Sequence, residues 1–340
     1  MGKNKRALTT AAATAALLVG ALGATSATAQ AAAGKAPARI VNGPLVTATR
    51  DNAPYGVCGL TATDPTTHKI TDLTPAGAGC SPAASPDSKL LAYIGTQKPF
   101  TGGGPGYPTT PEMLHVMNRD GSHSRIIYRL PNSSYTLYGD LFTPDGAHLL
   151  FDVRNQAGAT QLYRIGLDGR GMVKVGLGFA KGDDVVPLAY SSDGRTLAAD
   201  VNGNLWLEKG TGKPYQPKLP ARPGYLMSAC FSPDGKEIAY SADGTDYITN
   251  LVTGKSVVIA KPYQDSGKDD FTFDAVAFSP DGKKIMLIRM EDIYAALGGY
   301  ATALETANVS SPTKLIQSGP TQSDGEVDDI LWLPATQAAR

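Results

Sequence analysis

Apolar and polar residues alternate along the chain in short runs that tight-turn sequences separate. The clearest unit is FSPDGKEIAY at residues 231–240, in which apolar or β-branched residues flank a Ser-Pro-Asp-Gly turn on both sides. Proline presets φ, aspartate hydrogen-bonds its own backbone and glycine adopts positive φ, so the unit predicts a β-hairpin. Related units recur along the chain, with turn aspartates at Asp87, Asp145, Asp193, Asp234 and Asp281. In two of them Ser88 replaces the glycine and Ser192 replaces the proline, and we expect those turns to be strained or of another type.

The spacing of these hairpins predicts a β-propeller. Successive turn aspartates are 58, 48, 41 and 47 residues apart, which is about the length of one propeller blade. A second strand–turn–strand segment follows each hairpin, as at residues 114–130 and 161–175. Each blade is therefore expected to contain four antiparallel strands, and no helical period of useful length competes with this assignment.

The two ends of the predicted propeller complement each other. Residues 43–49, 55–64 and 68–74 predict three strands of a blade that has no first strand, and residues 327–334 predict a single first strand. Pairing them completes one blade and hides open sheet edges. The expected fold is all-β, a six-bladed β-propeller of four-stranded antiparallel blades, formed by one domain over residues 40–334 and followed by a tail, 335–340.

Two segments carry a resemblance to a known family. FSPDGKEIAY (231–240) and LHVMNRDGSHSRIIY (114–128) resemble the WD-like propeller repeats of the TolB family, which also occur in the propeller domains of prolyl-oligopeptidase-type enzymes. The resemblance covers roughly residues 40–334 and implies the architecture. TolB itself has an α/β domain ahead of its propeller, and the stretch between Ala31 and Ile40 is too short for one. The resemblance therefore does not imply a Tol-type translocation role.

The N-terminal segment has the three-part pattern of a secretory signal peptide. Three basic residues among the first six precede an apolar run at 11–24, and small residues follow up to Ala31. The run is shorter than the roughly 20 residues that span a bilayer. We expect residues 1–31 to be cleaved, 32–39 to form a short linker, and the mature chain to be secreted or extracytoplasmic without an integral membrane segment. An uncleaved membrane anchor is the alternative.

Charge and cysteine content narrow the partners and the redox state. The chain has 31 basic and 31 acidic residues, so no basic field favours nucleic acid. The expected partner is an extracytoplasmic protein, a peptide or an envelope glycan. In an exported chain, Cys58 and Cys80 are expected to form a disulfide, with free buried thiols as the alternative. Cys230 occupies a repeat position where small residues recur, and it is expected to act as a small buried hydrophobe.

Loop lengths predict which face of the propeller binds a ligand. The turns between the first and second strands and between the third and fourth strands of a blade are short and share one face. The long segments, such as 95–113 and 290–302, collect on the opposite face, where function usually resides. That long-loop face also carries acidic pairs ahead of three inner strands, and tyrosines. The candidate ligand-binding residues are Asp183, Asp184, Asp269, Asp270, Asp274, Asp328, Asp329, Tyr107, Tyr294 and Tyr300.

These residue types support more than one interpretation. Carboxylates at the mouth of the central channel could hold a cation such as Ca²⁺, which takes several oxygen ligands, or they could simply keep strand entrances soluble. No cofactor is otherwise indicated. The tyrosines suit contacts with sugars or peptides, or they pack their own loops. None of the four histidines has metal-ligand spacing, and they are expected to be structural or exposed.

No sequence motif of a known catalytic class was found, including GxSxG, HExxH, GxGxxG and the P-loop. The favoured function is an exported, non-catalytic TolB-like propeller that acts as a protein-, peptide- or glycan-binding scaffold through its long-loop face. The alternative is a metal-dependent propeller enzyme, a lactonase, lyase or hydrolase, with its site at the channel mouth. The acidic residues favour the alternative, whereas the lack of histidine at the inner-strand entrances counts against it.

Overall fold

A computed structural model gives the structure of the chain. It describes residues 41–51, 58–75, 78–96, 112–180, 182–210, 212–219, 226–262, 270–294, 299–317 and 325–335. The expected signal peptide (1–31) and linker (32–39) lie outside these ranges. None of the described residues forms a helix with the length and hydrophobicity that a membrane crossing requires.

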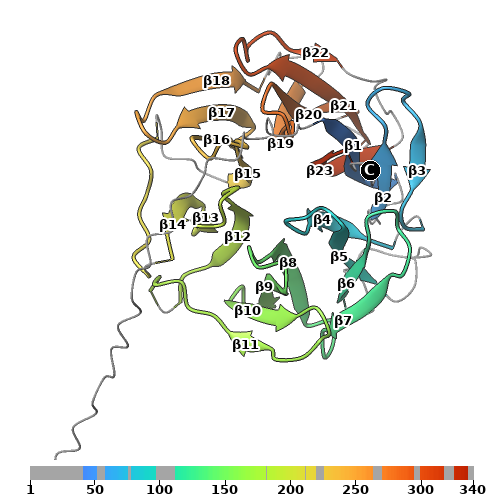
Figure 1. The fold of residues 1–340 in the computed structure, drawn as a ribbon, viewed down its shortest axis with the longest axis vertical. Coiled ribbons are helices and arrows are strands. Elements are labelled where there is room, and N and C mark those ends of the chain that lie inside the picture. Colours follow the sequence, from blue (N-terminus) through green and yellow to red (C-terminus); the bar gives the residue numbers. More distant parts are fainter. Residues whose placement is uncertain are drawn as a thin grey trace, which may run out of the picture. The chain divides into compact units, whose positions relative to one another are not determined.

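The described residues of the compact unit Ile40–Arg340 form a six-bladed β-propeller, as the repeats predicted (Figure 1). Blade 1 contains β4 (Cys80–Ala84), β5 (Leu90–Thr96), β6 (Glu112–Asn118) and β7 (Arg125–Arg129). Blade 2 contains β8 (Tyr135–Phe142), β9 (His148–Asn155), β10 (Thr160–Gly166) and β11 (Val173–Lys174). Blade 3 contains β12 (Val185–Tyr190), β13 (Leu197–Val201) and β14 (Asn204–Glu208). Each of these three blades is an antiparallel sheet whose strands follow in chain order from the centre outwards.

Blades 4 and 5 follow the same plan, whereas the innermost strand of blade 6 comes from the C-terminal end of the chain. Blade 4 contains β15 (Leu226–Phe231), β16 (Glu237–Ala242), β17 (Thr245–Asn250) and β18 (Ser256–Ala260). Blade 5 contains β19 (Asp270–Phe278), β20 (Lys284–Tyr294), β21 (Gly299–Asn308) and β22 (Ile316–Gln317). Blade 6 contains β23 (Gly325–Pro334), β1 (Asn42–Asp51), β2 (Cys58–Thr63) and β3 (Ile70–Asp72).

The outermost strand of blade 3 is reduced to a single bridge between Leu207 and Tyr215. Pro214 and Pro217 flank this bridge in the sequence. Proline has no N–H to donate to a strand ladder, so this segment cannot extend its pairing in either direction. The expected fourth strand is therefore present only as this local contact.

The two ends of the chain close the propeller in blade 6, as expected. β23 pairs antiparallel with β1, and Trp332 lies opposite Leu45. The Trp332 indole Nε1 donates to the Gly43 carbonyl at 3.2 Å, and a Cβ on Gly43 would lie 2.6 Å from the Pro334 oxygen. Glycine is thus required where the two ends cross. The Asp281 backbone N–H also donates to the Asn42 side-chain oxygen at 3.1 Å, which ties blade 6 to blade 5.

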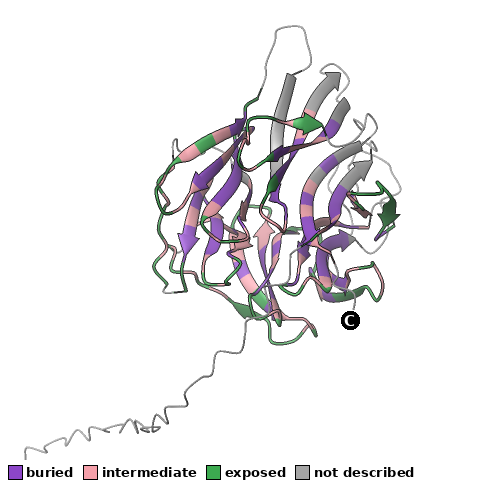
Figure 2. Ribbon diagram, turned by 45° about the horizontal axis from the view of Figure 1, so that its top comes forward, coloured by how far each residue is buried: buried purple, intermediate pink, exposed green. Residues whose placement is uncertain are grey.

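The hydrophobic core lies between neighbouring blades. The inner strands β4, β8, β12, β15, β19 and β23 contact one another in sequence around the ring. Ala92 and Leu114 of blade 1 belong to one buried cluster with Phe142 and Phe151 of blade 2. Buried residues follow the strands, and exposed residues gather in the turns and outer strands (Figure 2). Burial on both faces of each blade therefore joins the repeats into one unit.

One hydrogen-bonded turn recurs at the end of each of five inner strands, and we call it the serine–aspartate turn, although Thr143 replaces the serine in blade 2. In the copy at Ser232, its hydroxyl donates to Asp234 Oδ1 at 2.7 Å and accepts from the Glu237 N–H at 3.0 Å. The Gly235 N–H closes the turn on the Ser232 carbonyl at 2.8 Å. The hydrogen bond from the serine hydroxyl is the largest of the causes that lower the pKa of Asp234 below its usual value. The carboxylates of the turn aspartates therefore stabilise the turns.

The two variant copies keep this turn. Ser88 N–H bonds to the Ser85 carbonyl at 2.7 Å, and Gly194 N–H bonds to the Ser191 carbonyl at 2.8 Å. The expectation of another turn type is therefore wrong, because the serine side chain and backbone suffice to hold the geometry. Ser88 does have a φ of 56°, the left-handed region in which a Cβ is unfavourable.

Replacing Ser88 by glycine is expected to raise the free energy of unfolding by up to about 1 kcal/mol. Removing the Cβ from a left-handed residue relieves roughly 1–2 kcal/mol, and the greater entropy of unfolded glycine offsets about half. The matched control is Gly235→Ser, at a φ of 69°, where an added Cβ would lie 3.8 Å from the nearest atom. This control should lower stability by a similar amount. Urea unfolding curves measure both, and a loss of stability in Ser88→Gly would contradict the prediction.

A disulfide joins Cys58 in blade 6 to Cys80 in blade 1, with the two Cα atoms 5.1 Å apart. Cys230 is a free cysteine that packs against the buried residues of blades 4 and 5. Burial raises the pKa of its thiol to about 12, so the sulfur stays protonated and unreactive at neutral pH.

Candidate functional site

The structure describes some of the ten candidate residues with their side chains and others only by their position in a strand, and two lie outside the described residues. Asp269 and Tyr107 lie outside the described residues. Five candidates are placed by their positions in strands: Asp270, Asp274, Tyr294, Tyr300 and Asp328. The remaining three, Asp183, Asp184 and Asp329, are described with their side chains.

Asp274 and Asp328 occupy equivalent β-bulges on adjacent blades. In β19, Phe273 pairs with Arg289 and Ala275 pairs with Ile288, so Asp274 is the extra residue. In β23, Asp328 is likewise skipped between the residues that pair with Thr49 and Ala48. All six inner strands show a pairing irregularity. Because bulges redirect side chains and recur beside functional sites, this level of the propeller is a reasonable place for a binding site.

A group of charged side chains lies where blade 2 meets blade 3, on the long-loop face. We call it the Arg154 cluster: Tyr138 from β8, Asp152 and Arg154 from β9, Asp184 just before β12, and Asp200 from β13. Arg154 Nη2 donates to Asp184 Oδ2 at 2.9 Å. The guanidinium carbon also lies 4.5 Å from the centroid of the Tyr138 ring, a cation–π distance.

A tight turn holds Asp184 in place. Asn202 and Gly203 have φ values of 54° and 78°, and they connect β13 to β14 as the asparagine–glycine turn of a hairpin. The Asn202 side chain accepts from the Asp184 N–H at 3.0 Å and donates to Asp183 Oδ1 at 2.9 Å. The other oxygen of Asp183 accepts from the Ala180 N–H at 2.8 Å. Asp183 therefore stabilises the local fold through both of its oxygens, whereas the Asp184 side chain bonds to Arg154.

The carboxylates of the cluster have more acceptor capacity than the fold uses. Asp152 is 0% exposed and neither of its side-chain oxygens has a hydrogen-bond partner. Burial raises its pKa to about 8, with Arg154 opposing and Asp184 reinforcing the shift. Burial also raises the pKa of Asp200 to about 6. Asp184 Oδ1 and Asp200 Oδ1 are also without partners. Near neutral pH, Asp152 is largely protonated and Asp200 largely ionised.

A second buried carboxylate lies in the bulge of β8. Asp140 is 7% exposed and neither of its side-chain oxygens has a hydrogen-bond partner. Burial raises its pKa well above the usual value, and the charge of Asp329 raises it further. Asp329 Oδ1 accepts from the Ile330 N–H at 2.8 Å. The structure thus brings candidate Asp329 within electrostatic reach of a residue that the sequence analysis did not select.

Sequence reasoning missed Asp140, Asp152, Arg154 and Asp200, although the three aspartates stand at repeat positions that could have marked them. Asp152 and Asp200 each lie seven residues after a turn aspartate, so they share one repeat position. Asp140 stands where the other inner strands have Pro82, Leu188, Ala229, Val276 and Ile330. A polar residue at an apolar repeat position is a usable signal for a site in a repeat protein.

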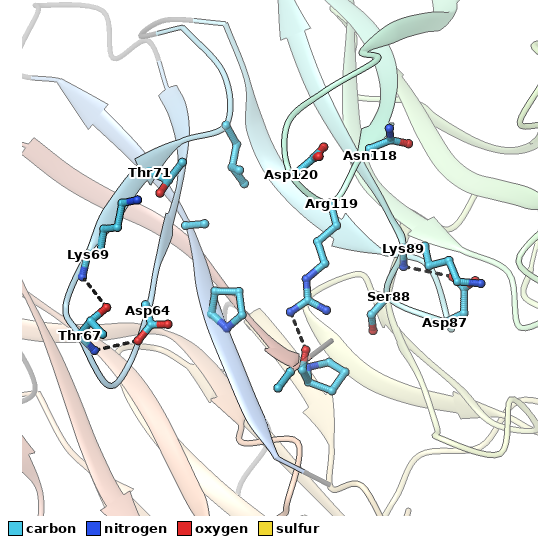
Figure 3. Close-up of a pocket in the computed structure, with 15 residues that line it drawn as sticks. Asp64, Thr67, Lys69, Thr71, Asp87, Ser88, Lys89, Asn118, Arg119 and Asp120 are labelled. Atoms are coloured by element: carbon cyan, nitrogen blue, oxygen red, sulfur yellow. Dashed lines mark hydrogen bonds and ion pairs between the residues drawn. The ribbon is translucent and has the colours of Figure 1, made fainter. Parts of the chain in front are cut away.

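A groove with a volume of about 960 Å³ lies on the opposite face, between blades 6 and 1 (Figure 3). Arg119 projects into it and donates to the Pro334 carbonyl, while Lys69 and Asp64 line the other side. The groove carboxylates accept from their own turns; Asp64 Oδ1, for example, accepts two backbone N–H groups at 2.8 Å. The groove was not among the candidate sites, and its charged groups mainly maintain the turns.

Within the described ranges, no group of three or more His, Cys, Asp or Glu side chains is arranged to hold a metal ion. Several candidate carboxylates lie outside those side-chain descriptions, so the Ca²⁺ hypothesis stays a prediction. Of the histidines, His115 stacks on Tyr93 with ring centroids 4.6 Å apart. Burial lowers its pKa to about 4, and it is neutral at physiological pH.

Solved structures resemble this chain in fold. TolB from Acinetobacter baumannii matches with a TM-score of 0.62 and 17% identity, over 85% of this chain and 66% of that one. A structure assigned as TolB from Agrobacterium tumefaciens matches with a TM-score of 0.55 and 12% identity, over 86% of this chain and 99% of that one. The periplasmic gluconolactonase PpgL from Pseudomonas aeruginosa matches with a TM-score of 0.49 and 12% identity, over 85% and 98% of the two chains.

The likeness to the two TolB structures agrees with the propeller architecture and leaves the activity open. The chain spans about 66% of the length of the Acinetobacter TolB that it matches. No protein-family model matches the sequence, and no curated protein matches it significantly. The class that fold and site define is a six-bladed β-propeller with a charged cluster between two blades.

Proposed function

We propose that the chain is an extracytoplasmic, non-catalytic propeller that binds a protein or peptide through the face that carries the Arg154 cluster. The signal-peptide pattern of residues 1–31 supports the location. The observation that carries the binding role is the set of cluster carboxylate oxygens that the fold does not use. Buried polar groups are normally hydrogen-bonded, and exceptions concentrate at functional sites.

The two faces of the propeller differ in how they use their acidic side chains. On the short-turn face, turn aspartates such as Asp87 and Asp234 accept hydrogen bonds from their own turns. In the Arg154 cluster, Asp184 remains 38% exposed and Arg154 31% exposed, with acceptor atoms left over. Solvent and an incoming partner therefore reach the Asp184 and Arg154 side chains, whereas the acceptor atoms left over are themselves buried.

Photo-cross-linking tests this function. A photoreactive phenylalanine analogue replaces Tyr138, which is exposed on the long-loop face, or Val252, which is 81% exposed in a turn on the opposite face. We expect the Tyr138 position to capture a discrete polypeptide in the envelope of cells that export the chain, and the Val252 position to capture none. The adduct should decrease when Asp184 and Asp200 are changed to asparagine. The same products at both positions, or no adduct at Tyr138, would refute the proposal.

A specific observation supports the enzyme alternative as well. A carboxylic acid with a pKa near 8 beside an arginine and a tyrosine is also the composition of an acid–base site. The discriminating assay follows lactone hydrolysis and eliminative cleavage of uronate oligosaccharides by the full exported chain, with and without added Ca²⁺ or Mn²⁺. Turnover that disappears in both Asp152→Asn and Asp184→Asn would replace the binding function by an enzymatic one.

A further inference from the structure

Building on the proposed function, we infer that the Arg154 cluster binds an organic cation, a primary ammonium or guanidinium group presented by the partner. The cluster brings three carboxyl groups from three segments of two blades around one internal guanidinium. When all are ionised, Arg154 balances only one of the three negative charges. An incoming cation would balance a second, and its N–H groups would donate to carboxylate oxygens that have no partner.

The second observation is the state of Asp152. Its carboxyl group is fully buried and both oxygens are without hydrogen-bond partners. It lies opposite Tyr138 in the β8–β9 ladder, two residues from Arg154, so it faces the same side of the blade as the guanidinium. The charges of Arg154 and Asp184 both act on it. A buried acceptor that is left unsatisfied costs free energy, and a donor group from a ligand would remove that cost.

The geometry favours an organic cation over a metal ion. The described carboxylates do not converge in a metal-holding group, whereas Ca²⁺ takes six to eight oxygen ligands around one point. An ammonium group needs three separate acceptors, and a guanidinium needs acceptors spread along its edges. Asp152, Asp184 Oδ1 and Asp200 Oδ1 provide such separate acceptors. The exposed ring of Tyr138 can contact the methylene chain that carries the charge.

Arg154 is an internal cation that already neutralises part of the negative charge of the cluster. Its guanidinium makes the contacts with Asp184 and Tyr138 that a ligand cation would also make. Arg154 therefore competes with the ligand for negative charge. Removing it should strengthen the binding of a cation, whereas it would abolish the binding of an anion.

Isothermal titration calorimetry on the full exported chain tests the inference with defined probes. The first probe is the capped peptide acetyl-Gly-Lys-Gly-amide, and its control contains acetyl-lysine, which keeps the methylene chain and removes the charge. We expect the lysine peptide to bind at least tenfold more tightly. Cadaverine, a free diamine, is the third probe. Equal or tighter binding of cadaverine would support the inferred group and assign it to a free amine rather than to a polypeptide.

Variants locate the binding. Asp184→Asn should weaken binding about tenfold or more, the factor for one lost charge-assisted hydrogen bond. The matched control is Asp72→Asn, which removes one exposed negative charge on β3 of blade 6 and should leave binding unchanged. Arg154→Gln should bind the lysine peptide more tightly. Thermal unfolding of each variant verifies that it is folded, and only folded variants enter the comparison.

Proton release provides a readout that a structural role would not produce. A cation that binds beside Asp152 should displace its proton, so near pH 7 the binding heat of the wild type depends on the ionisation enthalpy of the buffer. Asp152→Asn should abolish that dependence. Arg154 and Asp184 are the charged groups that act on the proton affinity of Asp152.

Two results would overturn the inference. One is the absence of lysine-peptide binding at about 10 mM, a concentration that would nearly saturate a site with a Kd of 1 mM. The other is loss of all ligand binding in folded Arg154→Gln, which would assign the site to anions. If the lysine peptide does not bind while cross-linking at Tyr138 persists, the inferred cation is wrong and the proposed function stands. If both fail, the proposed function fails too.

Discussion

Replacing Asp152 by asparagine is expected to stabilise the protein clearly at pH 8 and to destabilise it slightly at pH 4. Burial raises the pKa of Asp152 to about 8 in the folded state, against about 4 in the unfolded chain. Below pH 4 the carboxyl group is protonated in both the folded and the unfolded state, so it does not change the folding equilibrium. As the pH rises from 4 to 8, only the unfolded chain loses the proton, so the wild type loses stability across this window. Above pH 8 both states are ionised and the penalty levels off.

The magnitude follows from the same shift. Each unit of pKa difference corresponds to about 1.4 kcal/mol, which sets an upper limit of about 5 kcal/mol at pH 8. The asparagine amide stays buried, and an unsatisfied buried amide costs roughly 1–3 kcal/mol. We therefore expect Asp152→Asn to gain about 2–4 kcal/mol in the free energy of unfolding at pH 8, and to lose stability slightly at pH 4.

Urea unfolding of both proteins from pH 4 to pH 9 measures the effect. Asp234→Asn is the control of opposite sign, because the pKa of Asp234 is lowered by its turn. A carboxylate with a lowered pKa stabilises the fold above its unfolded pKa, and that contribution disappears as the pH falls. Asp234→Asn should therefore destabilise at pH 7 and become neutral in acid. A pH-independent effect of Asp152→Asn would show that Asp152 is ionised in the folded protein.

The same substitution has a second expected consequence. Asp152→Asn should remove proton-linked binding while it stabilises the fold. Residues that are kept for binding often cost stability, because their polar groups remain unsatisfied until the ligand arrives. Opposite signs for stability and binding at one residue would distinguish a binding group from an ordinary core residue.

Loss of the disulfide is expected to lower the free energy of unfolding by about 3 kcal/mol. The bond closes a loop of 22 residues between Cys58 and Cys80. Cross-linking a loop of this length restricts the unfolded chain by about that amount in the chain-entropy model. The bond also connects blade 6, where the chain ends meet, to blade 1.

Guanidinium unfolding with and without dithiothreitol measures this effect. Reductant should destabilise the wild type and leave the double variant Cys58→Ala/Cys80→Ala unchanged. Cys230→Ala retains the disulfide, so it should respond to reductant as the wild type does. Equal stability of oxidised and reduced wild type would contradict the prediction.

Particular residues show how far sequence reasoning reached. The candidate Asp183 lies beside the cluster, yet both its oxygens accept hydrogen bonds from Asn202 and Ala180, so its role is structural. Its neighbour Asp184 was selected for the same reason and bonds to Arg154 instead. Adjacent aspartates look alike in sequence, and only the direction of each side chain separates them. Asp152 was not selected because an isolated carboxylate within an apolar strand matches no motif, and only comparison of the repeats aligns it with Asp200.

By itself the sequence determined the hairpins, the blade period and the closing of blade 6 by residues from both ends of the chain. These features depend on local turn chemistry and on alternation along single strands, which are properties of neighbouring residues. The charged cluster was decided only by the tertiary structure. Tyr138, Arg154, Asp184 and Asp200 come from separate segments, and they meet because blade 2 packs against blade 3. The pKa values of Asp152 and Asp200 arise from desolvation, and desolvation exists only after that packing forms.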